Sequence, residues 1–413
     1  MLLRGTLRDE EGAGEGGGAV EKEGAFGGGE HPLVVDDERG QEVQRHAHRD
    51  DGGADAQAPF AYNVHIRNIN VLPELAGLRG IAALGIVVTH VAFQTATDSP
   101  LLARFDYFVA VFFALSAFLL ARGEPRPARE YYWRRVARIV PAYVVSVAII
   151  VVTLPPLAGV RAGPLLANLT LTQLYVSGGL IDGLTQHWSL CVEVAFYLVL
   201  PAYLACGRRG RAVVLAVAVA AALVWPHLIP SPEQTPGELN LQIWPISFAP
   251  WFAVGLLCAE VERAGRTWRP RVPALRWVFP ALSLPVAWAG GVLGPAGLEH
   301  PSAAEFNVRV LLGALFAALW IVPFALAPRL HGTALCTRSA QLLGRWSYSL
   351  FLWHMAVLYF VFPILGVGLF DAHFVPVLTL TVALSLVVSY LFYSWVEVPG
   401  ARVVHQLRAG VVR

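Results

Sequence analysis

The chain has 413 residues, of which 56% are hydrophobic and 15% are charged, and its mean hydropathy is +0.55. Charged residues make up roughly a quarter of an ordinary soluble domain, so this composition indicates a polytopic membrane protein. The net charge of +2 argues against nucleic-acid binding, and the spacing of the four cysteines argues against a zinc site or a disulfide framework.

Residues 1–65 are rich in glycine and glutamate and have no apolar periodicity. Such a segment buries too little apolar surface to offset the chain entropy lost on folding, so we expect a disordered tail. It has no apolar core of the kind that signal peptides carry. An alternative is that translation begins at a valine such as Val71, so that residues 1–70 are not made.

From about residue 75 onward, apolar segments long enough to cross a bilayer follow one another with short breaks. We therefore predict an all-α fold with about ten transmembrane helices. The expected spans are 76–97, 105–121, 139–158, 187–206, 211–229, 242–260, 275–294, 309–327, 346–369 and 374–396. Prolines interrupt the sixth to eighth, which membrane helices tolerate where neighbouring groups satisfy the freed backbone.

The distribution of arginine predicts the orientation of these spans. If the N-terminus is cytoplasmic, the inward-facing loops carry twenty arginines, whereas the outward-facing loops carry only Arg104, Arg161 and Arg309. Cytoplasmic loops of membrane proteins are enriched in arginine and lysine. We therefore expect both termini in the cytoplasm, with residues 401–413 as a short cytoplasmic tail.

Arg79 and His90 lie eleven positions apart in the first apolar segment. At about 100° per residue, eleven steps return to nearly the same helix face three turns later. Ionisable groups within a membrane helix are costly, so they indicate a functional site, although snorkelling or mutual pairing is the alternative. Counting about 1.5 Å per residue places His90 near the middle of the bilayer and Arg79 at its cytoplasmic side.

Glu193 is expected to reach a depth similar to that of His90 from the outer end of the fourth span. A carboxylate beside an imidazole fixes its tautomer and favours proton uptake, which is what a general base needs. The alternative is a structural polar contact between helices, and this is the more common role for Ser116. The further polar pocket candidates at membrane depth are Ser116, His187, Trp188, Ser189, Tyr197, Tyr348 and His354.

Arg134, Arg135 and Arg138 lie at the cytoplasmic entrance of the third span, within about one helical turn of one another. Guanidinium forks match phosphate oxygens, so this cluster is suited to the nucleotide end of a phosphorylated cytoplasmic co-substrate. Anchoring to anionic lipid headgroups is the alternative interpretation.

Five motifs occur together in the order found in the membrane acyltransferase 3 family, which residues 70–400 resemble. The motifs lie at residues 78–90, 112–118, 132–141, 188–197 and 347–354. The resemblance implies an integral enzyme of the bacterial inner membrane that transfers an acyl group, usually acetyl, from acyl-CoA to a hydroxyl. Acceptors in this family are mostly sugars of surface polysaccharides, lipopolysaccharide or peptidoglycan, and hydroxyls of macrolide-type natural products.

The resemblance also implies residue roles. His90 is expected to be the catalytic histidine, with Arg79 as its partner, Arg135 and Arg138 as the donor-binding pair, and Glu193 as the essential acidic residue. His90 would either deprotonate the acceptor hydroxyl or carry the acyl group itself, and Arg79 would hold donor phosphate or stabilise the oxyanion. No metal is implied.

Two positions depart from the family pattern. Ala117 replaces the usual glycine after Ser116, and Val194 stands where a second polar residue often follows Glu193. Both are expected to reshape the acceptor pocket.

Two other classes of function remain open at the level of sequence. One is a membrane O-acyltransferase that acts on lipids through a deep histidine in a different order of helices, which the spacing from Arg79 to His90 argues against. The other is a transporter or flippase whose charged residues relay protons. The two halves of the chain show no inverted repeat that would favour it.

Overall fold

The computed structural model describes residues 72–411 apart from 124–125, 230–238, 269, 271, 296–298 and 330–331. Every regular element within these residues is helical, which confirms the all-α fold class, and they belong to one compact unit. The expected disordered tail at residues 1–65 and the alternative start at Val71 lie outside the described residues.

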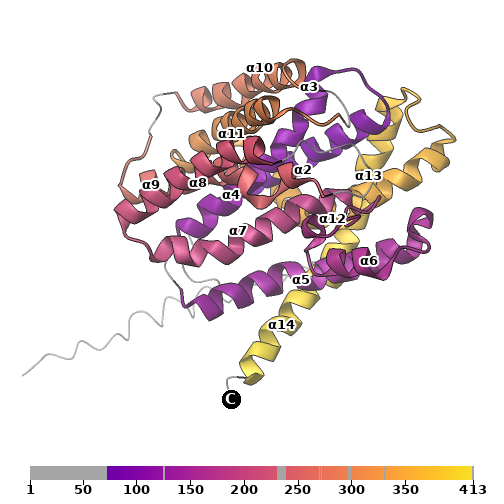
Figure 1. Ribbon diagram of the computed structural model, residues 1–413, viewed down its shortest axis with the longest axis horizontal. Coiled ribbons are helices and arrows are strands. Elements are labelled where there is room, and N and C mark those ends of the chain that lie inside the picture. Colours follow the sequence, from indigo (N-terminus) through magenta and orange to yellow (C-terminus); the bar gives the residue numbers. More distant parts are fainter. Residues whose placement is uncertain are drawn as a thin grey trace, which may run out of the picture. The chain divides into compact units, whose positions relative to one another are not determined.

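Nine helical segments in the described part of the chain are long and apolar enough to cross a membrane (Figure 1). Their helices are α2 (Pro73–Gln94), α3 (Pro100–Ala103) with α4 (Phe108–Ala121), α5 (Ala128–Thr153), α7 (Trp188–Ala205), α8 (Arg208–Leu228), α9 (Ala249–Arg263), α11 (Ala303–Ala325), α12 (Arg338–Leu365) and α13 (Phe374–Phe392) with α14 (Val398–Val411). They correspond to nine of the ten predicted spans, with ends that differ by several residues. The largest differences are in the last segment, where α14 ends fifteen residues beyond the predicted span, and in α5, which begins eleven residues before its predicted span and so contains the arginine cluster.

The remaining predicted span forms a shorter helix, α10 (Val278–Val292), preceded by the 3-10 turn η8 (Pro273–Trp277). At one end, the guanidinium of Arg276 binds the carboxylate of Glu74 in the first turn of α2, at 2.7 and 2.8 Å. At the other end, the carbonyl oxygen of Gly290 accepts a 2.9 Å hydrogen bond from Arg104, which lies between α3 and α4. The segment formed by η8 and α10 therefore extends from the start of α2 to the turn that follows the end of α2. We infer that this segment crosses the membrane as a tenth span.

The backbones of α2 and α12 are in direct contact near Gly80 and Gly344. A Cβ atom at Gly344 would overlap the carbonyl oxygen of Ala76, and one at Gly80 would lie 2.6 Å from the Cβ atom of Leu343. Small residues allow this close approach between membrane helices. The contact fixes the relative position of the two helices that carry His90 and His354.

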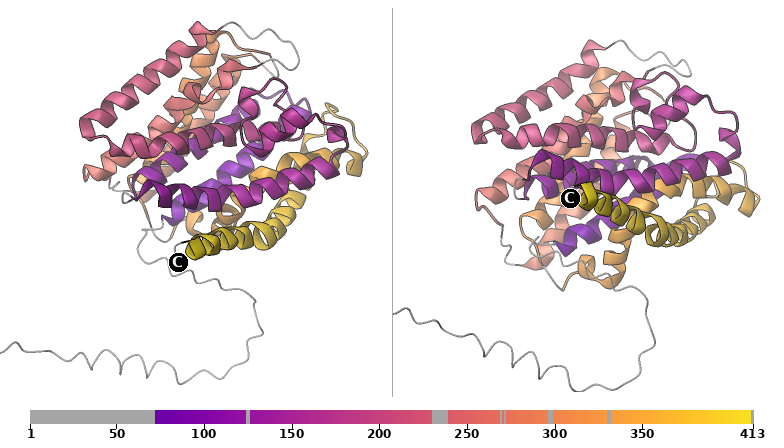
Figure 2. Two further views of the ribbon diagram at one scale, coloured as in Figure 1. Left: turned by 60° about the horizontal axis from the view of Figure 1, so that its bottom comes forward. Right: turned by 90° about the horizontal axis from the view of Figure 1, so that it is seen from below.

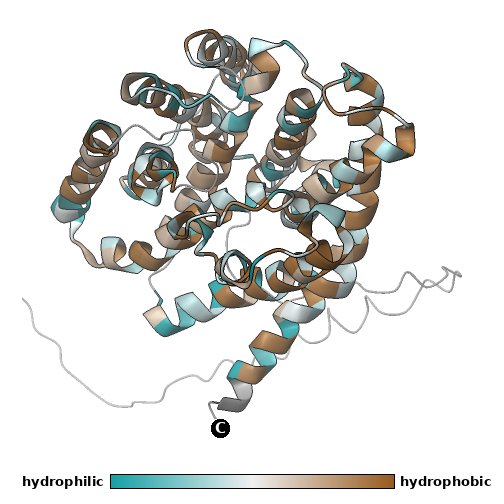
Figure 3. Cartoon of the chain, turned by 45° about the vertical axis from the view of Figure 1, so that its right-hand side comes forward, coloured by the Kyte–Doolittle hydropathy of each residue, from teal (hydrophilic) through white to brown (hydrophobic). Residues whose placement is uncertain are grey.

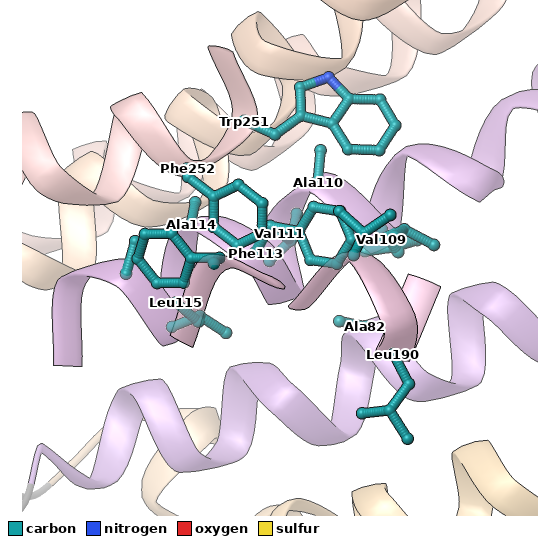
Figure 4. Close-up of a cluster of buried hydrophobic side chains, with 14 of the residues drawn as sticks. Ala82, Val109, Ala110, Val111, Phe113, Ala114, Leu115, Leu190, Trp251 and Phe252 are labelled. Carbon is teal, nitrogen blue, oxygen red and sulfur yellow. The ribbon is translucent and has the colours of Figure 1, made fainter. Parts of the chain in front are cut away.

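Aromatic rings join α4 to α9 (Figure 4). The rings of Phe113 and Phe252 stack at a centroid distance of 4.5 Å with an angle of 8° between their planes, and Trp251 packs against Phe113 at 5.9 Å. Offset stacking of this kind adds to the stabilisation from apolar burial. This layer supports α4, whose residues Val109, Phe112 and Phe113 line a cavity described below.

Hydrophobic residues are frequent along the helices (Figure 3), and many of them are exposed. Val152, Leu198, Val217, Leu282 and Val375 are all more than half exposed in the isolated chain. Exposed apolar surface on this scale is unfavourable in water and is typical of contact with lipid.

The chain continues as a helix beyond the predicted last span. A π-helical turn, η10 (Tyr393–Glu397), joins α13 to α14, and α14 runs beside α5 (Figure 2). The segment expected as a short tail from residue 401 is therefore helical up to Val411. This arrangement brings Glu397 close to the arginine cluster of α5.

Candidate active site

Arg79 and His90 both lie on α2, as predicted. His90 is four residues before the helix ends at Gln94, which is a rise of about 6 Å. The expectation that His90 lies near the middle of the bilayer stays a prediction. Arg79 lies six residues after the start of the helix.

Two cavities adjoin Arg79 and have a common wall. The first, which we call the arginine cavity, is lined by Arg79, Arg135, Arg138 and Ser116 among others. The second, the apolar cavity, is lined mainly by hydrophobic residues such as Ile86 and Phe351. Both are lined by Arg79, Leu190, Glu193 and Tyr348. Because they share these four residues, the two cavities are adjacent along α2, and we call the pair the path from the arginine cluster toward His90.

Only two of the three clustered arginines line this path. Arg135 lies 5.8 Å above the ring of Tyr197, and its buried Nε atom has no hydrogen-bond partner among the described residues. Arg138 lies 5.6 Å above the ring of Tyr348 and forms an ion pair with Glu397.

Arg134 points elsewhere and binds the carboxylate of Glu130 at 2.7 Å, one turn earlier on α5. The prediction that all three arginines act together is therefore not supported for Arg134. The reason is that successive residues on a helix face in directions about 100° apart.

Glu193 is held by two hydroxyl groups in the wall that both cavities share. Its Oε1 atom accepts hydrogen bonds from Ser116 Oγ and, at 2.5 Å, from the hydroxyl of Tyr197. Arg79 lies in the same wall and forms no hydrogen bond or ion pair with any residue that the structure describes. One carboxylate and one unpaired guanidinium therefore face the same path.

His90 has a different partner from the one expected. Its Nδ1 atom lies 2.9 Å from Nε2 of His354 on α12, and the ring centroids are 5.0 Å apart with an angle of 23° between the ring planes. No hydrogen bond joins His90 to Glu193 among the described residues. The expected pairing of these two is not found, because the Glu193 carboxylate is bound by Ser116 and Tyr197 and the His90 ring by His354.

His354 is 1% exposed, and its Nδ1 atom lies 3.1 Å from the carbonyl oxygen of Leu350 and 2.9 Å from that of Phe351. The path ends close to this pair without reaching it. Ile86 and Phe351, which line the apolar cavity, precede His90 and His354 by four and three residues. His90 itself does not line either cavity, so about one helical turn separates the cavity from the imidazole pair.

The other pocket candidates are divided between the path and its surroundings. Tyr197 and Tyr348 line the arginine cavity, and the hydroxyl of Tyr348 donates a 3.0 Å hydrogen bond to the carbonyl oxygen of Ile139. Ser189 lines the apolar cavity.

His187 and Trp188 do not line the path. The ring of His187 is buried between Tyr143 and Phe351, and its Nδ1 atom has no hydrogen-bond partner. Trp188 packs against Phe248 at a centroid distance of 5.1 Å. Within the described residues, no group of three or more His, Cys, Asp or Glu residues is arranged to hold a metal ion.

Glu397 is a site residue that sequence reasoning missed. It is 3% exposed, pairs with Arg138 and accepts a 2.7 Å hydrogen bond from Ser349. It follows directly on the predicted tenth span, where a charged residue is unremarkable. The π-helical turn that ends at Glu397 directs the carboxylate inward, and such turns are frequent at functional sites.

A family model described as "Acyltransferase domain" matches residues 72–394. The chain is 29% identical over 340 residues to the acyltransferase MdmB of Streptomyces mycarofaciens, covering 71% of this chain and 81% of that protein. It is 28% identical over 290 residues to nodulation protein 10 of Rhizobium leguminosarum bv. viciae, covering 63% and 74% of the two chains. It is 21% identical over 363 residues to the peptidoglycan O-acetyltransferase OatA of Listeria monocytogenes, covering 79% of this chain and 55% of that protein. No solved structure matches the chain.

Proposed function

Because this chain belongs to the acyltransferase 3 family, we propose that it transfers an acetyl group from acetyl-CoA to a hydroxyl of a carbohydrate or a glycosylated natural product. Membership of the family supports the class of reaction. One relative is a peptidoglycan O-acetyltransferase, which supports acetyl as the acyl group and a carbohydrate as the acceptor.

The path from the arginine cavity toward His90 is the observation that carries this proposal. The nucleotide phosphates of the donor bind at Arg135 and Arg138, because guanidinium groups match phosphate oxygens and Arg135 Nε is buried without a partner. The pantetheine arm follows the path past Arg79 into the apolar cavity. The thioester then lies one helical turn from His90 and reaches it when the side chains of Ile86 and Phe351 move aside.

The reaction needs a base, and His90 supplies it in this proposal. The acceptor hydroxyl loses its proton to His90 while its oxygen bonds to the thioester carbonyl carbon. The carbon–sulfur bond then breaks, and the CoA thiolate takes the proton from His90. Among the described residues Arg79 has no carboxylate partner, so its charge is available to hold a donor phosphate.

Glu193 acts at the middle of the path. Its Oε1 atom is occupied by Ser116 and Tyr197, which fixes the carboxylate in the wall shared by the two cavities. From there its charge attracts Arg79 and keeps that guanidinium directed into the path during the reaction. This electrostatic role does not require contact with His90.

The test uses membranes that contain the full chain, radiolabelled acetyl-CoA and a panel of sugars, macrolide glycosides and lipids. We expect label in a sugar-containing acceptor, release of CoA thiol that depends on the acceptor, and neither in a His90→Ala variant that inserts normally. Label confined to lipid would instead favour a lipid-directed acyltransferase. Absence of both label and thiol release, or full activity of His90→Ala, would contradict the proposal.

A further inference from the structure

The hydrogen bonds around His354 determine which of its ring nitrogens carries the proton. The Nδ1 atom lies within hydrogen-bond distance of two carbonyl oxygens of its own helix, those of Leu350 and Phe351. A carbonyl oxygen only accepts hydrogen bonds, so Nδ1 is the protonated nitrogen. In the neutral imidazole, Nε2 then has a lone pair and accepts.

This assignment extends to His90. The Nε2 atom of His354 is 2.9 Å from Nδ1 of His90, and one of the two nitrogens has to donate. Since the nitrogen of His354 accepts, Nδ1 of His90 carries the proton. The lone pair of His90 is then on Nε2, the ring atom that is not engaged by His354.

We propose that His354 is a positioning residue that holds His90 in its Nδ1–H tautomer, so that Nε2 of His90 takes up the proton of the acceptor. That the proton comes from the acceptor rests on the proposed function. The tautomer of His90 follows from the hydrogen bonds alone. It assigns to a buried neutral imidazole the role that the sequence suggested for the carboxylate of Glu193.

A neutral partner suits this location. When His90 becomes an imidazolium, its Nδ1–H bond to His354 becomes charge-assisted and therefore stronger. His354 is nearly fully buried, and a carboxylate held there would carry a large desolvation cost. The imidazole orients His90 through a hydrogen bond without placing a second charge in the core.

Two substitutions at His354 separate the hydrogen bond from packing. His354→Gln keeps an oxygen that can accept from His90 Nδ1, whereas His354→Leu removes the acceptor. We expect His354→Leu to lower kcat by about 100-fold with little change in KM for acetyl-CoA, and His354→Gln to restore most of the activity. The matched control is His227→Gln. His227 lies on α8, away from the path, and contacts Asn307 of α11.

The tautomer can be measured without activity. In protein labelled with nitrogen-15 in its 12 histidines, the His90 signals are identified by their loss in His90→Gln, and nitrogen chemical shifts report which ring nitrogen is protonated. We expect Nδ1–H for His90 in the wild type and in His354→Gln, and the Nε2–H form, which is preferred in water, in His354→Leu.

An Nε2–H tautomer of His90 in the wild type would overturn the inference, as would wild-type kcat in a folded His354→Leu variant. These failures differ from failure of the proposed function, in which the wild type transfers no acyl group or His90→Ala remains active. If His354→Leu does not fold, the wild-type spectrum and the His354→Gln variant still decide the question.

Discussion

Arg134 and Arg135 are neighbours in the sequence with different surroundings in the structure. Arg134 is paired with Glu130, whereas Arg135 lines the arginine cavity with a buried, unpartnered Nε atom. A hydrogen bond to a charged group contributes roughly 1.5–3 kcal/mol. We therefore expect Arg135→Ala to raise KM for acetyl-CoA by about tenfold or more, and Arg134→Ala to leave it nearly unchanged.

Initial rates measured over a range of acetyl-CoA concentrations check this pair of variants. Equal effects of the two substitutions on KM would mean that the arginines act only through the overall positive charge of the membrane surface.

Substitutions at Glu193 separate the effect of its negative charge from the effect of its hydrogen bonds. In Glu193→Gln the amide oxygen can still accept from Ser116 and Tyr197, so the local structure should persist while the negative charge is lost. We expect kcat to fall by about 100-fold with an almost unchanged melting temperature.

Glu193→Ala, in contrast, leaves two hydroxyls without their acceptor and should lower stability as well, by about 1–3 kcal/mol per unsatisfied group. Thermal unfolding and kcat, measured on both variants in detergent, make the comparison. A Glu193→Gln variant with full activity would show that the charge is dispensable.

The sequence carried enough information to predict which helix carries Arg79 and His90, but not the partners of these residues. The spacing of Arg79 and His90 follows from the helical repeat, and the structure places both on α2. His90 and His354 are 264 positions apart, so their contact depends on how α2 packs against α12. The site residue Glu397 was missed because its inward direction comes from a π-helical turn that has no clear sequence signal.

At the scale of elements, the contact between α2 and α12 controls the histidine pair. Gly→Ala normally favours a helix interior by about 1 kcal/mol, but a Cβ atom at Gly344 would overlap the carbonyl oxygen of Ala76. We expect Gly344→Ala to cost about 1–3 kcal/mol of stability and to lower kcat, because the displaced helices separate His90 from His354.

Gly163 in α6 (Ala162–Leu169) is the matched control, because no other atom lies within 4 Å of a Cβ built there. Gly163→Ala should leave both the melting temperature and kcat nearly unchanged. A Gly344→Ala variant as stable and active as the wild type would show that the two helices can move apart without consequence.

Helix positions were more predictable than helix ends. Apolar runs located every long helix, because a membrane span needs about 20 apolar residues. They missed the first part of α5, since its polar and charged residues interrupt the apolar pattern although they continue the helix. They also could not show that α10 is short and is completed by a 3-10 turn.

At the scale of the whole molecule, the number of crossings determines the side on which the chain ends. The arginine distribution predicts ten crossings, and the contacts of η8 and α10 with both ends of the α2 region support the same number. We therefore expect a green fluorescent protein fused after Arg413 to fluoresce in the cytoplasm. Alkaline phosphatase fused after Gly159, in the segment between α5 and α6, should be active on the outer side.

A chain in which α10 does not cross would place the C-terminus outside. Phosphatase activity at the C-terminus, together with a non-fluorescent fusion at the same position, would establish nine crossings and contradict the tenth.

The most direct test of the account is a structure of the full chain in a lipid nanodisc with a non-reactive thioether analogue of acetyl-CoA. The account predicts the phosphates at Arg135 and Arg138, the pantetheine arm along the path past Arg79, and the thioether beside His90 with Phe351 displaced. Phosphates bound away from Arg135 and Arg138, or a thioether that ends away from His90, would contradict it.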